Sequence, residues 1–356
     1  MNKLKDLYQQ HEGKSSDKWD IYLSVYDEYL KDKRSAISNI LEIGVQNGGS
    51  LEIWSKYFTS AKNLVGCDIN PACKKLEFSH SGIKVVVGDS STLKIKNEIS
   101  SLSSSFDLII DDGSHTSSDI IKSFLLYFPL VNNDGYYIIE DLHASYWERF
   151  EGGLFYPYSS MSFLKKLADI PNKEHWGSSL SESDYLSPFY QFYDCESFDA
   201  VDYTQIHSVT FVNSLCIIKK KSIENNLLGA RYIAGDVFDV SANQKSIHGD
   251  MINVPPQDKN IWSKLKTFPE FEWAELLTKE KNNEVNSLST LVESTHHDFE
   301  LRIKLMQDEI NEKNNDVIAH EKLILQLTNR NNELLNSTSW RITKPLRAIM
   351  KKIRGK

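Results

Sequence analysis

IIDDGSH, residues Ile109 to His115, is the most informative stretch of this sequence for its architecture. It begins as an apolar run, which is typical of a strand buried on both faces of a parallel sheet, and it ends in carboxylates. A second stretch of the same kind, IIEDLHASYW, covers residues 138–147. Ligands of open α/β sheets bind at the carboxyl ends of the strands, so we expect both acidic clusters at one edge of one sheet.

These two stretches contain the carboxylates Asp112, Glu140 and Asp141, with His115 beside the first. Carboxylates that converge in a cleft repel one another unless a cation lies between them, and oxygen ligands favour a hard ion such as Mg²⁺. The alternative is that these residues are solvated acids at strand ends. Two clusters on neighbouring strands, one with a histidine, favour a metal site.

Predicted strands and helices alternate up to about residue 222. Strands are expected at Asn39–Ile43, Asn63–Asp68, Lys84–Val87, Phe106–Asp111 and Tyr136–Glu140, and a hairpin at Ile206–Phe211 and Leu215–Lys219. This alternation indicates βαβ units and a parallel sheet, and the hairpin adds an antiparallel strand at one edge. The predicted fold class is therefore α/β, with a Rossmann-like, mostly parallel sheet. Helical spacing also predicts an amphipathic helix over Trp19–Leu30.

A second set of residues indicates a cofactor site. The loop LEIGVQNGGS follows the first predicted strand; Gly44 and Gly48 allow close backbone approach, and Glu42 lies beneath them. Asp68 ends the second strand, where an acid can accept both hydroxyls of a ribose. Asp89, after the third strand, could accept from an adenine amino group. Each acid alone could be a capping or turn residue, but their order suits an adenosine cofactor.

Composition narrows the class of protein. The chain has 356 residues and a net charge of −8, yet the last sixteen residues carry seven cations and no acid. An acidic body does not suggest nucleic-acid binding. No apolar run is long enough for a transmembrane helix, the N-terminus does not resemble a signal peptide, and four cysteines form no CxxC pair. A reducing cytoplasm is the expected location.

The C-terminal part has a different composition. Residues 284–336 show a 4-3 apolar spacing that predicts a coiled coil, and hence a homo-oligomer; a lone solvated helix or a partly disordered linker is the alternative. Residues 337–356 combine apolar and basic side chains and could form an amphipathic helix on an anionic membrane surface. A basic tail without a membrane role is an equally open interpretation.

The cofactor motif resembles that of the class I S-adenosylmethionine (SAM)-dependent methyltransferases. IIDDGSH, IIEDLHASYW and the N-terminal stretch HEGKSSDKWDIYLSVYDEYL resemble a metal-dependent branch, which contains macrolide sugar O-methyltransferases of the mycinamicin and macrocin type. Cephalosporin hydroxylase-like proteins are relatives of that branch. The resemblance implies SAM and Mg²⁺ as cofactors and a sugar or glycan hydroxyl as acceptor. STSWRITKPLR resembles a segment at the ends of many bacterial surface-polysaccharide enzymes.

The resemblance also implies roles for individual residues. His115 would be the general base, and His143 is a second candidate for a base or orienting group, although a structural histidine is the preferred interpretation. The implied metal ligands are Asp112, Glu140 and Asp141. The cofactor-binding residues are expected to be Glu42, Gly44, Gly48, Asp68, Asp89 and Asp111.

The expected organisation places a helical segment at residues 1–37 before a methyltransferase domain at 38–222, within which residues 146–203 form an aromatic lid insertion. Residues 223–283, without an assigned role, precede the coiled coil; within them, residues 231–240 could add a strand. The predicted function is methylation of a sugar in surface polysaccharide synthesis, by an enzyme in the cytoplasm or at the inner face of the membrane. The alternatives are antibiotic tailoring, by methyl transfer or by a hydroxylase-like reaction, and a non-catalytic scaffold.

Overall fold

The computed structural model describes residues 3–195, 200–257, 259–265 and 267–355. The chain divides into two compact units, Met1–Glu275 and Leu276–Lys356. Four residues of the predicted insertion, 196–199, and the last cation of the predicted tail, Lys356, lie outside the described residues.

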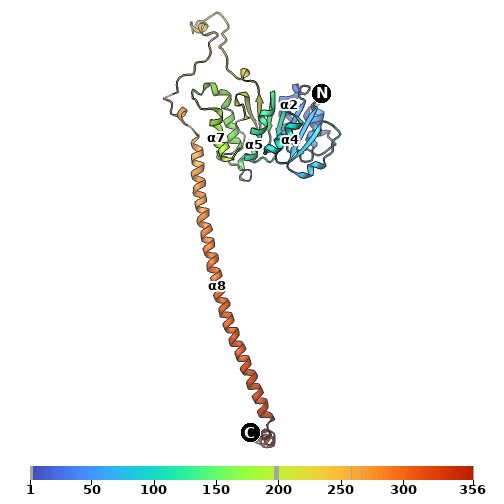
Figure 1. Ribbon diagram of the computed structural model, residues 1–356, viewed down its shortest axis with the longest axis vertical. Coiled ribbons are helices and arrows are strands. Elements are labelled where there is room, and N and C mark those ends of the chain that lie inside the picture. The colour runs from blue at the N-terminus through green and yellow to red at the C-terminus, as the bar shows by residue number, and fades with distance from the viewer. Residues whose placement is uncertain (1–2, 196–199, 258, 266, 356) are drawn as a thin grey trace. The chain divides into compact units, whose positions relative to one another are not determined.

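A seven-stranded sheet forms the centre of the first unit, in the order β3-β2-β1-β4-β5-β7-β6 (Figure 1). The strands are β1 Asn39–Ile43, β2 Asn63–Asp68, β3 Ile83–Val87, β4 Phe106–Asp111, β5 Val131–Ile139, β6 Ile206–Val212 and β7 Leu215–Lys220. The first five pair in parallel, and β7 runs antiparallel to both β5 and β6. The α/β class with a Rossmann-like, mostly parallel sheet is therefore confirmed.

Helices alternate with the strands because the apolar periodicity of the chain changes from two residues to about 3.6 between them. They are α1 Leu4–Gln9, α2 Asp20–Leu30, α3 Gly49–Tyr57, α4 Leu93–Leu102, α5 Ser117–Tyr127, α6 Ser160–Leu167 and α7 Glu182–Phe192. Two apolar clusters cover the two faces of the sheet. One contains Tyr26 of α2 and Trp54 of α3, and the other contains Phe124 of α5 and Phe163 of α6.

The helix predicted over Trp19–Leu30 is present as α2, with one difference. Trp19 caps the helix and is 59% exposed, whereas Tyr22 and Tyr26 are buried. The indole does not join the core because its Nε1 donates to Asp141. Trp19 therefore belongs to the edge of the sheet where the acids gather, and not to the packing face of the helix.

The segment between the sheet and the long C-terminal helix contains little regular structure. Within the described part of residues 223–268, it forms the short 3-10 helices Ile223–Asn225, Gln244–Ile247 and Ile261–Lys264. The strand expected at residues 231–240 is absent there, because these residues are mostly exposed and pair with no strand of the sheet. That expectation was wrong.

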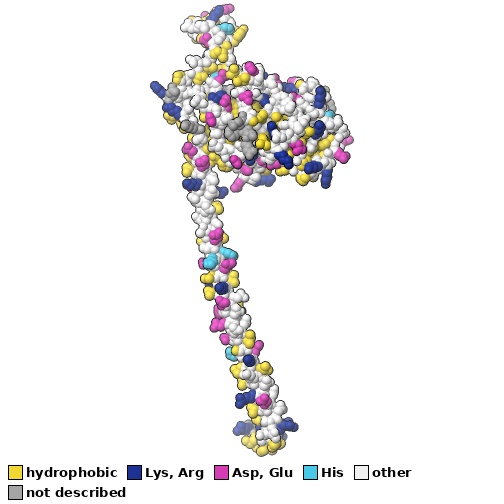
Figure 2. Space-filling model, viewed as in Figure 1, with side chains coloured by type: hydrophobic (Ala, Val, Ile, Leu, Met, Phe, Trp, Pro, Cys, Tyr) yellow, Lys and Arg dark blue, Asp and Glu magenta, His cyan; other side chains and the backbone are white. Residues whose placement is uncertain are grey.

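Helix α8 covers Pro269–Asn336, and its first turn packs Phe271 into the core of the first unit. In the second unit, α9 Thr338–Ile342 and α10 Lys344–Arg354 follow. Figure 2 shows charges of both signs along α8, and hydrophobic and basic side chains together over the last two helices. Among the described helices, none is long and apolar enough to cross a membrane.

Candidate active site

The carboxyl ends of β1, β4 and β5 place three acidic side chains on the same face of the sheet. Side chains alternate between faces along a strand, so Glu42 shares a face with Ile40, and Glu140 shares one with Ile138. Glu42 is fully buried, Glu140 is 1% exposed, and Asp112 follows β4 on the same side. Their convergence is a direct result of strand register in a parallel sheet.

Lys18, from the segment before α2, supplies the cation that this cluster requires. Its side chain is 2% exposed, and its Nζ lies 3.0 Å from Glu140 Oε2, 4.0 Å from Glu42 Oε1 and in a short contact with Asp112 Oδ2. Burial would lower the pKa of Lys18, but the three carboxylates raise it well above its ordinary value. Lys18 is therefore a fixed positive charge beneath the site.

Glu140 points into this buried cluster. Its Oε1 accepts from the Tyr26 hydroxyl at 2.6 Å, while its Oε2 faces Lys18. Burial raises the pKa of both Glu140 and Asp112, against the opposing effect of the ammonium. Among the described residues, the group of possible metal-binding atoms consists of Asp112, His115 and Asp141, and Glu140 is not part of it.

In the group of Asp112, His115 and Asp141, one possible ligand atom from each residue lies within 4.8 Å of the others. His115 Nε2 lies 3.7 Å from Asp141 Oδ2, and both residues have a left-handed backbone, with φ of 60° and 56°. Such conformations cost free energy and concentrate at functional sites. The two carboxylates offer the oxygen ligands that Mg²⁺ prefers, and a single imidazole does not complete the two-histidine, one-carboxylate set of iron oxygenases.

Aromatic side chains of the N-terminal segment fix Asp141. Its Oδ1 accepts from Trp19 Nε1 at 3.0 Å and from the Tyr22 hydroxyl at 2.8 Å, and the same hydroxyl accepts from the Asp141 backbone N–H at 3.0 Å. Its Oδ2 has no such donor among these contacts and faces His115. The carboxylate is therefore held in one orientation, with one oxygen directed toward the group.

Gly44 lets the glycine loop approach β4. It has φ of 92°, and a Cβ at this position would lie 1.9 Å from the carbonyl oxygen of Asp112. Gly48, the N-cap of α3, has φ of 83° and lies against the ring of Phe78. Both glycines are required by backbone conformation and by close approach. The glycine loop and the backbone of Asp112 are thus in close contact.

Two cavities meet at this loop. One, of about 280 Å³, extends from Lys18 and Gly44 to Asp141, and the other, of about 160 Å³, is lined by Asp89 and Asp111. Gly44, Asp68 and Gly113 border both. An extended ligand can therefore reach from the third strand to the acids.

The two acids predicted to bind the cofactor, Asp68 and Asp89, already accept hydrogen bonds from nearby backbone groups. Asp68 Oδ2 accepts from the backbone N–H groups of Val45 and Gln46 at 2.9 and 2.8 Å. Asp89 Oδ1 accepts from the backbone and hydroxyl of Ser91. Both sets of hydrogen bonds stabilise loops, which agrees with the capping or turn role considered as the alternative for each acid. Both acids nevertheless line the cavities, so a loop role and a ligand role are compatible.

Asp111 lies on the opposite face of β4 from the acidic cluster. It is 4% exposed, accepts from the Tyr137 hydroxyl at 3.2 Å, and borders the smaller cavity. Burial raises its pKa to about 7. Asp111 thus borders the smaller cavity and does not belong to the group of Asp112, His115 and Asp141, so its predicted cofactor role stays a prediction.

His143 lies at the outer side of the acids. Its Nδ1 is 2.6 Å from the Ser214 hydroxyl and 4.0 Å from Asp141 Oδ1. Its ring contacts Trp19 and Trp147 edge-on, at 6.0 and 5.0 Å between centroids. The ring is held by partners from two separate elements, which suits an orienting role.

Sequence reasoning missed the cation of this site. A signal was available, because the alternation of side chains predicts that Glu42, Asp112 and Glu140 share one buried face, and such a set requires a counter-ion. The sequence did not identify which lysine supplies it, since Lys18 precedes Asp112 by 94 residues. The roles of Tyr22 and Tyr26 were also missed, because helical spacing marks both simply as core residues.

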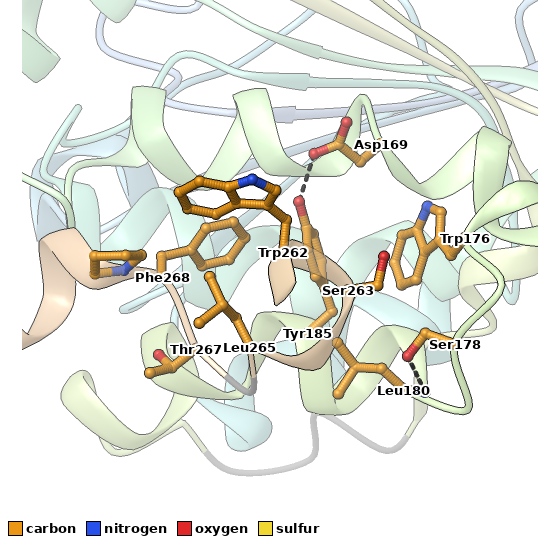
Figure 3. Close-up of a pocket in the computed structure, with 11 residues that line it drawn as sticks. Asp169, Trp176, Ser178, Leu180, Tyr185, Trp262, Ser263, Leu265, Thr267 and Phe268 are labelled. Atoms are coloured by element: carbon orange, nitrogen blue, oxygen red, sulfur yellow. Dashed lines mark hydrogen bonds between the residues drawn. The ribbon is translucent and has the colours of Figure 1, made fainter. Parts of the chain in front are cut away.

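A separate cavity of about 300 Å³ lies between α7 and the segment before α8 (Figure 3). Its walls are largely aromatic: Trp176, Tyr185, Trp262 and Phe268. The carboxylate of Asp169 at its border already accepts from Tyr185. No group of metal-binding residues lies among its described lining, so the acidic edge of the sheet is the candidate active site.

The chain is similar to known methyltransferases over part of its length. Residues 41–142 match a family described as "Methyltransferase domain". An 8-demethyl-8-alpha-L-rhamnosyl tetracenomycin-C 2'-O-methyltransferase of Streptomyces olivaceus is 34% identical over 165 residues, 43% of this chain and 42% of that protein. A mycinamicin VI 2''-O-methyltransferase of Micromonospora griseorubida is 34% identical over 155 residues, 40% of this chain and 38% of that protein. The chain spans about two fifths of the length of these curated relatives.

Solved structures show the same fold. A structure titled MycE methyltransferase from the mycinamycin biosynthetic pathway, in complex with Mg, SAH and mycinamycin VI, has a TM-score of 0.51 and 24% identity. The match covers 62% of this chain and 54% of that chain. At this level of identity, the comparison establishes the fold of the first unit.

Proposed function

We propose that this chain, which carries a class I SAM-dependent methyltransferase domain, transfers the methyl group of SAM to a hydroxyl of a sugar with the help of Mg²⁺. One observation carries the proposal: Asp112, His115 and Asp141 converge beside the glycine loop that contains Gly44. This convergence supports a metal ion and a base beside the cavities that border the glycine loop, where the adenosine cofactor would bind. The curated relatives with sugar O-methyltransferase names support the same chemistry.

In this proposal, Asp112 and Asp141 hold the metal ion, since their oxygens have the chemistry that Mg²⁺ prefers. Bound Mg²⁺ would lower the pKa of a coordinated sugar hydroxyl. The Lys18 ammonium neutralises part of the negative charge of Asp112 and Glu140, so these two carboxylates can stay close together without the ion. The contacts of Glu140 with Lys18 and Tyr26 support a role in holding the acidic cluster together rather than in binding the ion.

His115 is the proposed general base. Its Nε2 faces Asp141 Oδ2 at 3.7 Å and Asp112 Oδ1 at 4.0 Å, so a proton taken from a hydroxyl here would rest between two carboxylates. His143 is held by Ser214 and would orient the acceptor from the other side. The donated methyl group comes from SAM, and alignment of the two reactants supplies much of the rate.

The experiment that tests the proposal is calorimetric titration of SAM into the purified chain, with Mg²⁺ and then with EDTA. We expect micromolar binding in both conditions, because the cofactor loop and the metal-binding acids have separate ligand atoms. Absence of SAM binding under both conditions would reject the methyltransferase proposal. Methyl transfer to a sugar acceptor that continues in excess EDTA would reject the role of the metal.

The relatives favour antibiotic tailoring as the setting of this reaction over surface polysaccharide synthesis. One name refers to a rhamnosyl tetracenomycin C and the other to mycinamicin VI. The basic C-terminal helices support the other setting, since a glycan built at a membrane would be accessible to an enzyme held there. Analysis of products from the producing cells, with and without the gene, would distinguish the two.

The C-terminal unit has two proposed roles. The exposed apolar side chains of α8, with their 4-3 spacing, support self-association through a coiled coil. In α10, Leu346, Ile349, Met350 and Ile353 follow helical spacing, beside the cations, which supports peripheral contact of a cytoplasmic enzyme with an anionic membrane. Light scattering tests the first role, and sedimentation with anionic against neutral vesicles tests the second.

A further inference from the structure

A fourth cavity lies beside the candidate active site, next to His143. It has a volume of about 370 Å³ and lies between the loop after β5, helix α6 and the β6–β7 turn. The residues that line it are Leu142, His143, Tyr146, Met161, Lys165, Phe211, Val212, Asn213 and Ser214. A cavity of this size and mostly apolar lining is typical of small-ligand sites.

His143 borders both this cavity and the acidic site. Its Nδ1 lies 4.0 Å from Asp141 Oδ1, and its ring contacts Trp19. His143 also lines the cavity together with Ser214, whose hydroxyl is 2.6 Å from the same Nδ1. A molecule held at Asp141 can therefore continue past His143 into the cavity.

Ring contacts mark where the reacting unit would lie. Trp19, His143, Trp147, Phe150 and His115 form a chain of contacts, in that order. Its two ends, Trp19 and His115, both face Asp141. Trp19 and Trp147 are 59% and 50% exposed, so their rings are available to the apolar face of a sugar.

The cavity itself has an uncompensated positive charge. Lys165 of α6 lines it, forms no ion pair within the part of the chain that the structure describes, and has no carboxylate among the cavity's lining residues. Its neighbour Lys166, in contrast, pairs with Glu270 at 2.9 Å. The partly exposed rings of Tyr146 and Phe211 lie on the same cavity. Aromatic faces with one free cation suit a sugar that carries an anion.

We infer that this cavity is a second acceptor subsite, which binds the unit attached to the reacting sugar and pairs an anionic group of that unit with Lys165. The inference rests on the proposed function, since it places the reacting sugar at Asp141. The anion is a carboxylate, as in a uronic acid, or a phosphate, as in a phosphodiester-linked sugar. The acceptor is then at least two units long.

An array of immobilised oligosaccharides tests the subsite. The full chain, loaded with Mg²⁺ and S-adenosylhomocysteine, is applied to neutral, uronic acid-containing and phosphodiester-linked oligosaccharides. We expect selective retention of anionic members, with affinity about tenfold weaker in Lys165→Met, the effect of losing one charge-assisted hydrogen bond. Lys94→Met, which changes an exposed lysine of α4, is the matched control and should retain the wild-type pattern.

Comparing uronic acid-containing with phosphodiester-linked oligosaccharides identifies which anion is bound, and retention of either kind supports the subsite. Retention of neutral oligosaccharides alone, retention of no anionic member, or an unchanged pattern in Lys165→Met would overturn it. Calorimetry of S-adenosylhomocysteine with the same samples separates this result from failure of the proposed function. Cofactor binding without anionic glycan binding rejects only the subsite, whereas absent cofactor binding counts against the methyltransferase.

Discussion

Lys18 is the residue on which the balance of charge at the site depends. Its ammonium lies among Glu42, Asp112 and Glu140, in an environment with almost no access to solvent. Removing one partner of a buried ion cluster leaves the other charges uncompensated, which is far more costly than losing a surface ion pair. The residue therefore links the cofactor loop, the metal-binding acids and the N-terminal segment.

We expect Lys18→Met to lower the free energy of unfolding by about 3–5 kcal/mol, because buried carboxylates lose their cation. Urea denaturation at neutral pH measures the change. Lys94→Met should shift the same quantity by less than about 0.5 kcal/mol, as is usual for surface substitutions. Adding Glu140→Gln to Lys18→Met should recover part of the loss; a purely additive double variant would contradict the coupling.

The three acids predicted to bind the metal are expected to differ in importance. Asp112→Asn and Asp141→Asn should each weaken Mg²⁺ binding at least about tenfold, a typical cost of losing a ligand or its support. Glu140→Gln should have a smaller effect, because both oxygens of Glu140 face Tyr26 and Lys18. Titration with Mn²⁺, followed by electron paramagnetic resonance, gives the affinities. An equal loss in Glu140→Gln would instead place Glu140 among the ligands.

Gly44 provides a test of the contact between the two halves of the site. Gly44→Ala should abolish SAM binding in calorimetry, since its Cβ would collide with the Asp112 carbonyl oxygen. Gly229→Ala is the matched control, because Gly229 also has a positive φ, of 75°, but has open space around its Cβ position. Similar SAM affinity in the wild type and in Gly44→Ala would contradict the proposed role of the loop.

At the scale of elements, the segment before α2 is tied to α3 by an ion pair. Lys14 donates to Glu52 through its backbone N–H and its Nζ, both at 2.9 Å. Burial would raise the pKa of Glu52, but these bonds lower it below its ordinary value of 4.5. The backbone of Ser15 also accepts from Gly49. These contacts hold the segment that contains Lys18 over the cofactor cavity.

The pH dependence of stability follows from this lowered pKa. A carboxyl group whose pKa is lower in the folded than in the unfolded protein stabilises the fold at pH values above its unfolded pKa. This stabilisation is lost as the pH falls through its folded pKa. We expect Glu52→Gln to cost about 0.5–1 kcal/mol at pH 7, the range for a partly exposed pair, and to cost less below pH 4.5. Thermal denaturation at pH 7 and pH 3.5 measures this. If the cost of Glu52→Gln were larger at pH 3.5 than at pH 7, the lowered pKa of Glu52 would be contradicted.

Elements marked by a pattern of neighbouring residues could be predicted from the sequence, whereas contacts between distant residues could not. The boundaries of β1, β2 and β4 coincide with the predicted strands, because short apolar runs between turn residues mark buried parallel strands clearly. The start of α8 at Pro269 precedes the predicted coiled coil, since the first turns pack on the globular unit and lack the 4-3 spacing. Lys18 and Trp19 joined the site through tertiary contacts, which local pattern does not reveal.

At the scale of the whole molecule, the division into Met1–Glu275 and Leu276–Lys356 predicts separable roles. A chain that ends at Glu275 should keep SAM affinity within about twofold, because the candidate site and its supporting core lie before that residue. It should lose the self-association expected of the full chain. Calorimetry and light scattering measure the two properties. Loss of SAM binding on truncation would show that the second unit supports the site.

The contribution of the N-terminal segment has a consequence for synthesis of the protein. Lys18, Tyr22 and Tyr26 bond to residues that follow them by 94, 119 and 114 positions. On the ribosome, these early residues are made long before the end of β5, so their hydrogen bonds cannot form until the later residues have been synthesised. The reaction centre therefore closes only after most of the sheet has emerged, and a nascent chain that stalls before residue 140 would have no assembled centre.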